Sequence, residues 1–145
     1  YTTLFRSLGV PEGKEFIKPI IEFYYKDDQL DDPFINEEHI YFLQLAKPEE
    51  ISELKAQALA INEILTELFA KVGLVLVDFK LEFGRSNGQI LLADEVTPDT
   101  CRLWDERTNE HMDKDVYRRD LGDLIPVYQE VYNRLSELTE EKERV

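Results

Sequence analysis

The sequence contains little of what several classes of protein require. Its single cysteine, Cys101, excludes an internal disulfide framework and a cysteine-rich zinc site, and is typical of a protein from a reducing cytosol. No apolar run approaches the roughly 18–20 residues of a membrane-spanning helix, and the first residues do not resemble a targeting segment. We therefore expect a soluble, cytoplasmic protein without a membrane partner.

Positive charge is also scarce. The chain has 17 Lys and Arg against 31 Asp and Glu, which gives a formal charge of −14. Because no cluster of basic residues offsets this charge, the chain would repel a phosphate backbone, and we expect no nucleic-acid partner. The acidic excess suits cation binding, although a solvated acidic surface is its commoner explanation.

Several common catalytic motifs are missing as well. There is no Gly-rich phosphate loop and no Gly-x-Ser-x-Gly elbow, and His39 and His111 do not have a zinc-binding spacing. The 145 residues, 43% of them hydrophobic, are enough for one core, and no linker divides them. We predict a single domain over residues 1–145. A noncatalytic acidic α+β interaction module is the alternative to an enzyme.

Apolar periodicity predicts two long helices. The first begins at Pro48 and ends near residue 72, and the second begins after Asp123 and frays over residues 140–145. The apolar stripe of the first helix is Ile51, Leu54, Ala58, Ile61, Leu65 and Leu68, and that of the second is Leu124, Val127, Val131, Leu135 and Leu138. We also predict a helix over residues 113–121 and a partly helical segment over residues 34–45.

The remaining pattern predicts strands. Residues 17–25 are expected to form an edge strand, and residues 89–94 to pair with residues 74–83 in a hairpin. The alternation within residues 74–83 predicts a buried face of Val75, Val77, Phe79, Leu81 and Phe83 and a polar face of Asp78, Lys80 and Glu82. Residues 95–107 are expected to form a loop.

The length of the hairpin loop decides which charged side chains meet. A three-residue loop over residues 86–88 would place Lys80 opposite Asp94 and bring Glu82 to the same face, where the two carboxylates would bind a hard cation. A two-residue loop over residues 87–88 would send Asp94 to the other face. The sequence leaves both registers open, and the solvated face of an antiparallel sheet is the commoner explanation of such charges.

A second dense group of polar residues lies in residues 94–105. It combines carboxylates with Arg102 and the only tryptophan, Trp104. Arg102 is suited to a bidentate contact with a phosphate or carboxylate ligand, but an Arg–Asp pair that stabilises the fold is equally compatible. The alternating charges of residues 113–120 are more typical of surface ion pairs than of a site.

Five segments in the same order resemble motifs of the SAICAR synthetase family. They are KDDQLDDP (26–33), DFKLEFG (78–84), LADE (92–95), TPDTCRLWD (97–105) and MDKDVYRR (112–119). The resemblance covers residues 8–138 and implies an α+β, ATP-grasp-like fold with an antiparallel sheet and packed helices. The family's ATP-binding segment would precede residue 1, so the chain resembles the C-terminal catalytic portion, with a fold incomplete at the N-terminus.

The same resemblance implies an ATP-dependent ligase of purine biosynthesis. Such a ligase joins L-aspartate to carboxyaminoimidazole ribonucleotide (CAIR) through an acyl phosphate, with ATP and Mg²⁺ as cofactors, and a homo-oligomer is left open. By motif position, Glu82 and Asp94 are the metal ligands, and Lys80 and Asp78 are catalytic. The residues implied to bind substrate are Asp28, Asp32, Asp99, Arg102, Asp105, Lys114 and Arg118.

Overall fold

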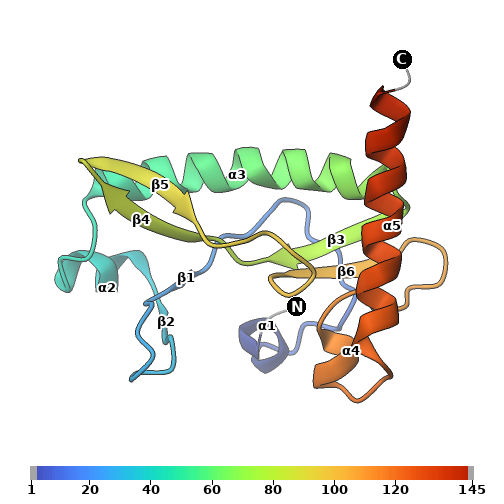
Figure 1. Ribbon diagram of the computed structural model, residues 1–145. Helices are drawn as coiled ribbons and strands as arrows, with labels where there is room; N and C mark the ends of the chain where they lie inside the picture. The colour runs from blue at the N-terminus through green and yellow to red at the C-terminus, as the bar shows by residue number, and fades with distance from the viewer. Residues whose placement is uncertain (1–2, 144–145) are drawn as a thin grey trace.

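The computed structural model describes residues 3–143, which form an α+β fold with antiparallel strand pairs (Figure 1). The strands pair as β1–β2, β3–β6 and β4–β5. The elements in chain order are α1 (Thr3–Ser7), β1 (Phe23–Tyr24), β2 (Phe34–Ile35), α2 (Glu37–Phe42), α3 (Pro48–Ala70), β3 (Leu74–Phe79), β4 (Glu82–Ser86), β5 (Gln89–Ala93), β6 (Cys101–Asp105), α4 (Asp115–Arg118) and α5 (Leu124–Glu143).

The first predicted long helix is confirmed as α3. It begins at Pro48, whose fixed φ suits the first helical position, and Glu50 in its first turn accepts the Lys47 N–H at 2.8 Å. In Figure 1, α3 runs across the molecule alongside β4–β5 at its start and towards β3 and α5 at its end. The helix thus links the two larger strand pairs.

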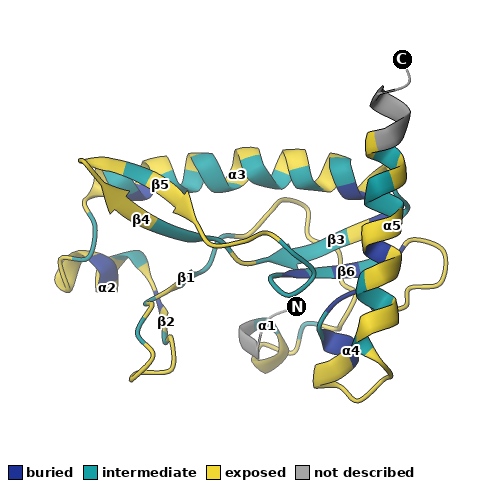
Figure 2. Cartoon of the chain, in the orientation of Figure 1, coloured by how far each residue is buried: buried dark blue, intermediate teal, exposed yellow. Residues whose placement is uncertain are grey.

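The main core lies where the end of α3 meets β3, β6 and α5 (Figure 2). Leu103 is completely buried there, and Val131 from the predicted stripe of α5 packs beside it. The second long helix is therefore confirmed, but α5 continues to Glu143 instead of fraying from residue 140. Residues 144–145 of that predicted frayed tail lie outside the described residues. A smaller core of Ile35, Ile40 and Ile51 joins β2, α2 and α3.

The predicted single strand over residues 74–83 is wrong, because the structure divides it. β3 ends at Phe79 and β4 begins at Glu82, and the two strands belong to different sheets. The predicted buried face is also wrong at its start, since Leu74 is buried and Val75 is 44% exposed. Residues 74–77 are apolar on both faces, so alternation alone could not choose the buried one. Packing against α3 and α5 chooses it instead.

A strand also replaces the predicted loop over residues 95–107. β6 pairs antiparallel with β3, with Leu74 opposite Asp105, and its residues alternate between buried and half-buried. The buried positions are Cys101, Leu103 and Asp105, so a carboxylate interrupts the apolar pattern that would have revealed the strand.

Two shorter elements also differ from expectation. The predicted strand over residues 17–25 is reduced to β1, because Pro19 lacks the N–H that a ladder requires and Ile17 is fully exposed. The predicted helix over residues 113–121 is only the single turn α4. The partly helical segment over residues 34–45 is confirmed, since it contains α2.

Candidate active site

The β4–β5 hairpin closes through a two-residue loop, so the three-residue alternative is wrong. Ser86 pairs with Gln89 and Glu82 pairs with Ala93. The loop residues Asn87 and Gly88 have φ of 50° and 78°, the left-handed pair that a tight hairpin turn needs. A continuous ladder in this register would not place Lys80 opposite Asp94.

The three charged side chains nevertheless converge. Lys80 lies in the break between β3 and β4, and Asp94 follows β5 with a φ of 68°, so neither side chain obeys the strand alternation. The Lys80 ammonium lies 2.7 Å from Glu82 Oε1 and 3.4 Å from Asp94 Oδ2. The interruption between β3 and β4 and the left-handed backbone at Asp94 therefore bring these side chains together, although the hairpin register alone would keep them apart. As a result, the carboxylates of Glu82 and Asp94 share the ammonium group of Lys80.

Lys26 joins this group from the acidic loop of residues 26–33. Its Nζ lies 3.2 Å from the same Glu82 oxygen that contacts Lys80. The hydrogen bond to Glu82 raises the pKa of Lys26, and the nearby charges of Asp32 and Asp28 act in the same direction. Asp32 also orders its own loop by accepting the Asp27 N–H at 2.8 Å. Sequence reasoning missed Lys26, although it opens the first motif that was noted.

A cation such as Mg²⁺ suits the Glu82–Asp94 pair on chemical grounds. Both side chains offer hard carboxylate oxygens at the surface, and positive charge in the form of Lys80 already lies between them. Among the described residues, His111, Asp113 and Asp115 also lie close enough together to share a metal. That group is less suitable, because Asp113 accepts the Leu103 and Asp115 amides and Asp115 accepts from Arg102 and Arg118.

Arg102 is the centre of a second cluster. It lies on β6 opposite Asp78 of β3, and its guanidinium bonds both Asp78 and Asp115, the latter at 2.7 Å. Burial of Asp115 disfavours its ionised form, but hydrogen bonds from Arg102 and Arg118 outweigh burial and lower its pKa. The β3–β6 ladder thus brings together Asp78 and Arg102, which belong to two different motifs.

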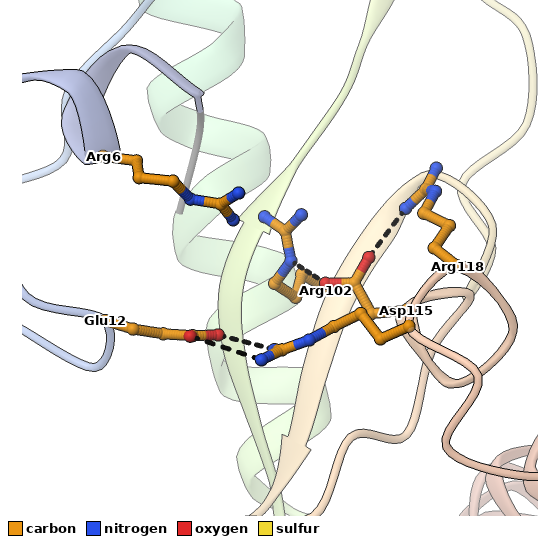
Figure 3. A pocket seen from close by; sticks show the side chains of 6 residues that line it. Arg6, Glu12, Arg102, Asp115 and Arg118 are labelled. Atoms are coloured by element: carbon orange, nitrogen blue, oxygen red, sulfur yellow. Dashed lines mark hydrogen bonds and ion pairs between the residues drawn. The ribbon is translucent and has the colours of Figure 1, made fainter.

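A pocket of about 450 Å³ opens beside Arg102 (Figure 3). Its lining residues are Arg6, Glu12, Arg102, Asp115, Arg118 and Arg119. Four guanidinium groups face two carboxylates, and the Arg119 group lies 2.7 Å from Glu12. This excess of planar cationic donors is suited to a phosphate group. The sequence pointed to Arg102 and Arg118, whereas Arg6, Glu12 and Arg119 come together only through the fold.

The last predicted site residues divide into two locations. Asp99 lies 2.6 Å from Lys114, whose hydrogen bond lowers the pKa of Asp99, and the Tyr128 hydroxyl approaches the same carboxylate. Asp105 is buried elsewhere, where it accepts two amides of the following turn and an ion pair from Arg134 at 2.9 Å. These bonds lower the pKa of Asp105 to about 2. Asp105 therefore stabilises the fold, and it does not line the arginine-rich pocket.

Together these clusters form a candidate site whose carboxylates and guanidinium groups are suited to a cation and to phosphates. A carboxylate pair suited to a cation is formed by Glu82 at the start of β4 and Asp94 just after β5. Four residues before Glu82, Asp78 pairs with Arg102, which lines the arginine-rich pocket. Comparison with known proteins agrees with this chemistry. The family model described as SAICAR synthetase matches residues 2–135, and the chain belongs to this family.

Individual relatives support the assignment. The phosphoribosylaminoimidazole-succinocarboxamide synthase of Enterococcus faecalis is 60% identical over 131 residues, which cover 90% of this chain and 55% of that protein. The enzyme of the same name from Persephonella marina is 53% identical over 92% of this chain and 56% of its own length. The chain thus spans about half the length of the curated relatives it matches.

Solved structures show the same fold. A structure described as SAICAR synthetase (Type-2) in complex with ADP is 50% identical and superposes with a TM-score of 0.89, over 94% of this chain and 59% of that one. The family resemblance expected from the five motifs is therefore confirmed. Within residues 3–143, none of the helices has the length and apolarity needed to cross a membrane.

Proposed function

We propose that this chain carries the metal and ribonucleotide sides of a SAICAR synthetase active site. In this proposal, an ATP-grasp-like ligase joins L-aspartate to CAIR and releases ADP and phosphate. The observation that carries the proposal is the convergence of Lys26 and Lys80 on Glu82. Glu82 lies four residues along the chain from Asp78, whose partner Arg102 lines the arginine pocket. The ligase reaction needs both clusters, because the phosphoryl group of ATP is transferred at one of them and the phosphate of CAIR is held at the other.

On the metal side, Glu82 and Asp94 would hold Mg²⁺, which neutralises charge on the transferred phosphoryl group when bound. In the structure, Lys26 pairs with Glu82, and Lys80 pairs with both Glu82 and Asp94. The flexible side chains of both lysines would allow their ammonium groups to contact the phosphate oxygens of ATP instead. Asp28 and Asp32, whose charges act on Lys26, would contact substrate from the same loop. The chain's own contribution is thus to place two ammonium groups beside the reacting phosphates.

On the ribonucleotide side, Arg102, Arg118 and Arg119 would bind the phosphate of CAIR. Asp78 and Asp115 fix the plane of the Arg102 guanidinium by bonding it from two directions. The CAIR carboxylate then attacks the γ-phosphorus of ATP, with ADP as the leaving group. The amine of L-aspartate attacks the resulting acyl phosphate, loses a proton and expels phosphate. Asp99 and Lys114, which pair with each other at 2.6 Å, would also contact the substrates.

The noncatalytic interaction module is not favoured. It requires the apolar stripe of residues 51–68 to face solvent in the monomer, where a partner would bind it. Instead Ile51 is buried, Leu54 packs against the smaller core and Leu65 packs against the main core. The stripe is therefore used within the chain.

A chimera tests the proposed function. In it, this chain replaces the matching region of the Enterococcus faecalis synthase, so that the rest of that enzyme is supplied. We expect ADP release that requires ATP, CAIR and L-aspartate together, followed by amide formation. A chimera that unfolds cooperatively yet releases no ADP, beside an active Enterococcus faecalis enzyme, would contradict the proposal.

A further inference from the structure

Arg85 joins the β4–β5 hairpin to the start of α3. Its Nε donates to Glu50 Oε1 at 2.6 Å, and its Nη2 donates to Glu50 Oε2 at 2.8 Å and to the Leu45 carbonyl at 2.7 Å. Glu50 is itself fixed, because it also accepts the Lys47 N–H. A bidentate contact to an anchored carboxylate is stronger and more directional than an ordinary surface ion pair.

The hairpin has few other anchors. It is a separate two-stranded sheet, and such a sheet is marginally stable unless it packs on something else. Leu91 and Leu92, on opposite faces of β5, are 47% and 43% exposed. Between the hairpin and α3 there remains a space of about 140 Å³, lined by Leu54, Phe83 and Ile90 among others. Apolar packing therefore leaves the angle of the hairpin poorly determined.

The orientation of the hairpin affects the candidate site, because Glu82 lies at the end of the hairpin opposite its loop. β4 begins with Glu82, three residues or roughly 10 Å from Arg85. Lys26, Asp78 and Arg102 belong to other parts of the fold. A change of hairpin angle would move Glu82 relative to these groups, and catalytic geometry tolerates only about 10–20° of such change.

We propose that Arg85 is a positioning residue, whose contacts with Glu50 and Leu45 set the hairpin angle and so hold Glu82 at Lys26 and at the correct distance from the arginine pocket. Arg85 itself touches no substrate in this account. The catalytic consequence rests on the proposed function, whereas the docking of the hairpin does not.

The acid-base behaviour of Glu50 is consistent with this arrangement. The hydrogen bonds from Arg85 and then from the Lys47 amide lower the pKa of Glu50 from 4.5 to about 2. Because the folded-state value is the lower one, the contribution of the pair is complete above about pH 4.5 and is lost as the pH falls towards 2. Docking of the hairpin should weaken over the same interval.

The test compares Arg85→Leu and Glu50→Gln with Lys55→Leu in the 145-residue chain. Lys55→Leu is the matched control, because it breaks the partly buried ion pair of Lys55 in α3 with Glu37 in α2 and does not remove a contact to the hairpin. We expect amides of β4 and β5 to exchange with solvent roughly tenfold faster in the first two variants, and their residual dipolar couplings to show a changed angle to α3. The control should change neither, and Arg85→Lys should restore part of the effect.

Two results would overturn the proposal: unchanged exchange in Arg85→Leu, or faster exchange with couplings that keep the original angle. In the chimera, Arg85→Leu should lower kcat about tenfold and leave KM for CAIR within twofold, because the arginine pocket is untouched. An inactive chimera that retains Arg85 would count against the proposed function only. Exchange and couplings need no turnover and would still decide the role of Arg85.

Discussion

Replacing Arg102 with leucine is expected to weaken binding of CAIR about 100-fold, because a charge-assisted bidentate contact to phosphate is lost. The same change should lower the free energy of unfolding by about 2 kcal/mol. Asp115 is only 6% exposed and would lose one of the two arginines whose hydrogen bonds outweigh its burial, so its pKa should rise. Calorimetric titration with CAIR and denaturant unfolding measure the two effects.

Arg134→Leu is the control for this prediction. Arg134 also pairs with a buried carboxylate, that of Asp105, but it lies away from the pocket. Its loss should destabilise the chain and leave CAIR affinity unchanged. Equal weakening of CAIR binding in both variants would mean that the effect of Arg102 is only structural, and would remove Arg102 from the ribonucleotide site.

Glu82→Gln and Lys80→Met are expected to change cation binding in opposite directions. Glu82→Gln removes an anionic ligand, so the affinity of the chain for Mn²⁺ should fall. Lys80→Met removes an ammonium group that competes for Glu82 and Asp94, so the affinity for Mn²⁺ alone should rise. In the chimera both variants should be slow, with Glu82→Gln reducing kcat by roughly 10³-fold.

Electron paramagnetic resonance of Mn²⁺ measures these affinities directly. Asp94→Asn should behave as Glu82→Gln does. Lys71→Met, at the C-cap of α3, should have no effect. A fall in Mn²⁺ affinity with Lys80→Met would show that Lys80 is not a competitor at the carboxylate pair. The assignment of Glu82 and Asp94 as ligands would then be wrong.

Sequence patterns predicted the parts of the fold that repeat. The stripes of α3 and α5 recur over several turns, so their periodicity was clear before packing was known. β6 was missed because its third inward position is Asp105, whose charge is balanced by Arg134 from a helix 29 residues later. A local sequence pattern cannot predict that Asp105 pairs with a residue this far along the chain.

The candidate site shows the same limit. Lys80, Glu82 and Asp94 do converge, but through the break after Phe79 and the left-handed Asp94, and not through the register of a three-residue loop. The motifs pointed to Arg102 and Arg118, and Arg119 lies in the same segment as Arg118, but no motif includes Glu12. Glu12 and Arg119 are 107 residues apart and meet only because the N-terminal segment folds against α4. Contacts of this kind follow from tertiary packing.

The most direct test of the central claim is NMR shift mapping of the 145-residue chain with Mg²⁺–ADP and with CAIR added separately. The account predicts that Mg²⁺–ADP shifts the amides around Lys26, Lys80, Glu82 and Asp94, and that CAIR shifts those around Arg102, Arg118 and Arg119. Two separate but adjoining sets of shifted amides would support one site for the ATP phosphates and a second, neighbouring site for the CAIR phosphate. Saturating ligands that leave both groups unshifted, or that shift only the outer face of α3, would contradict it.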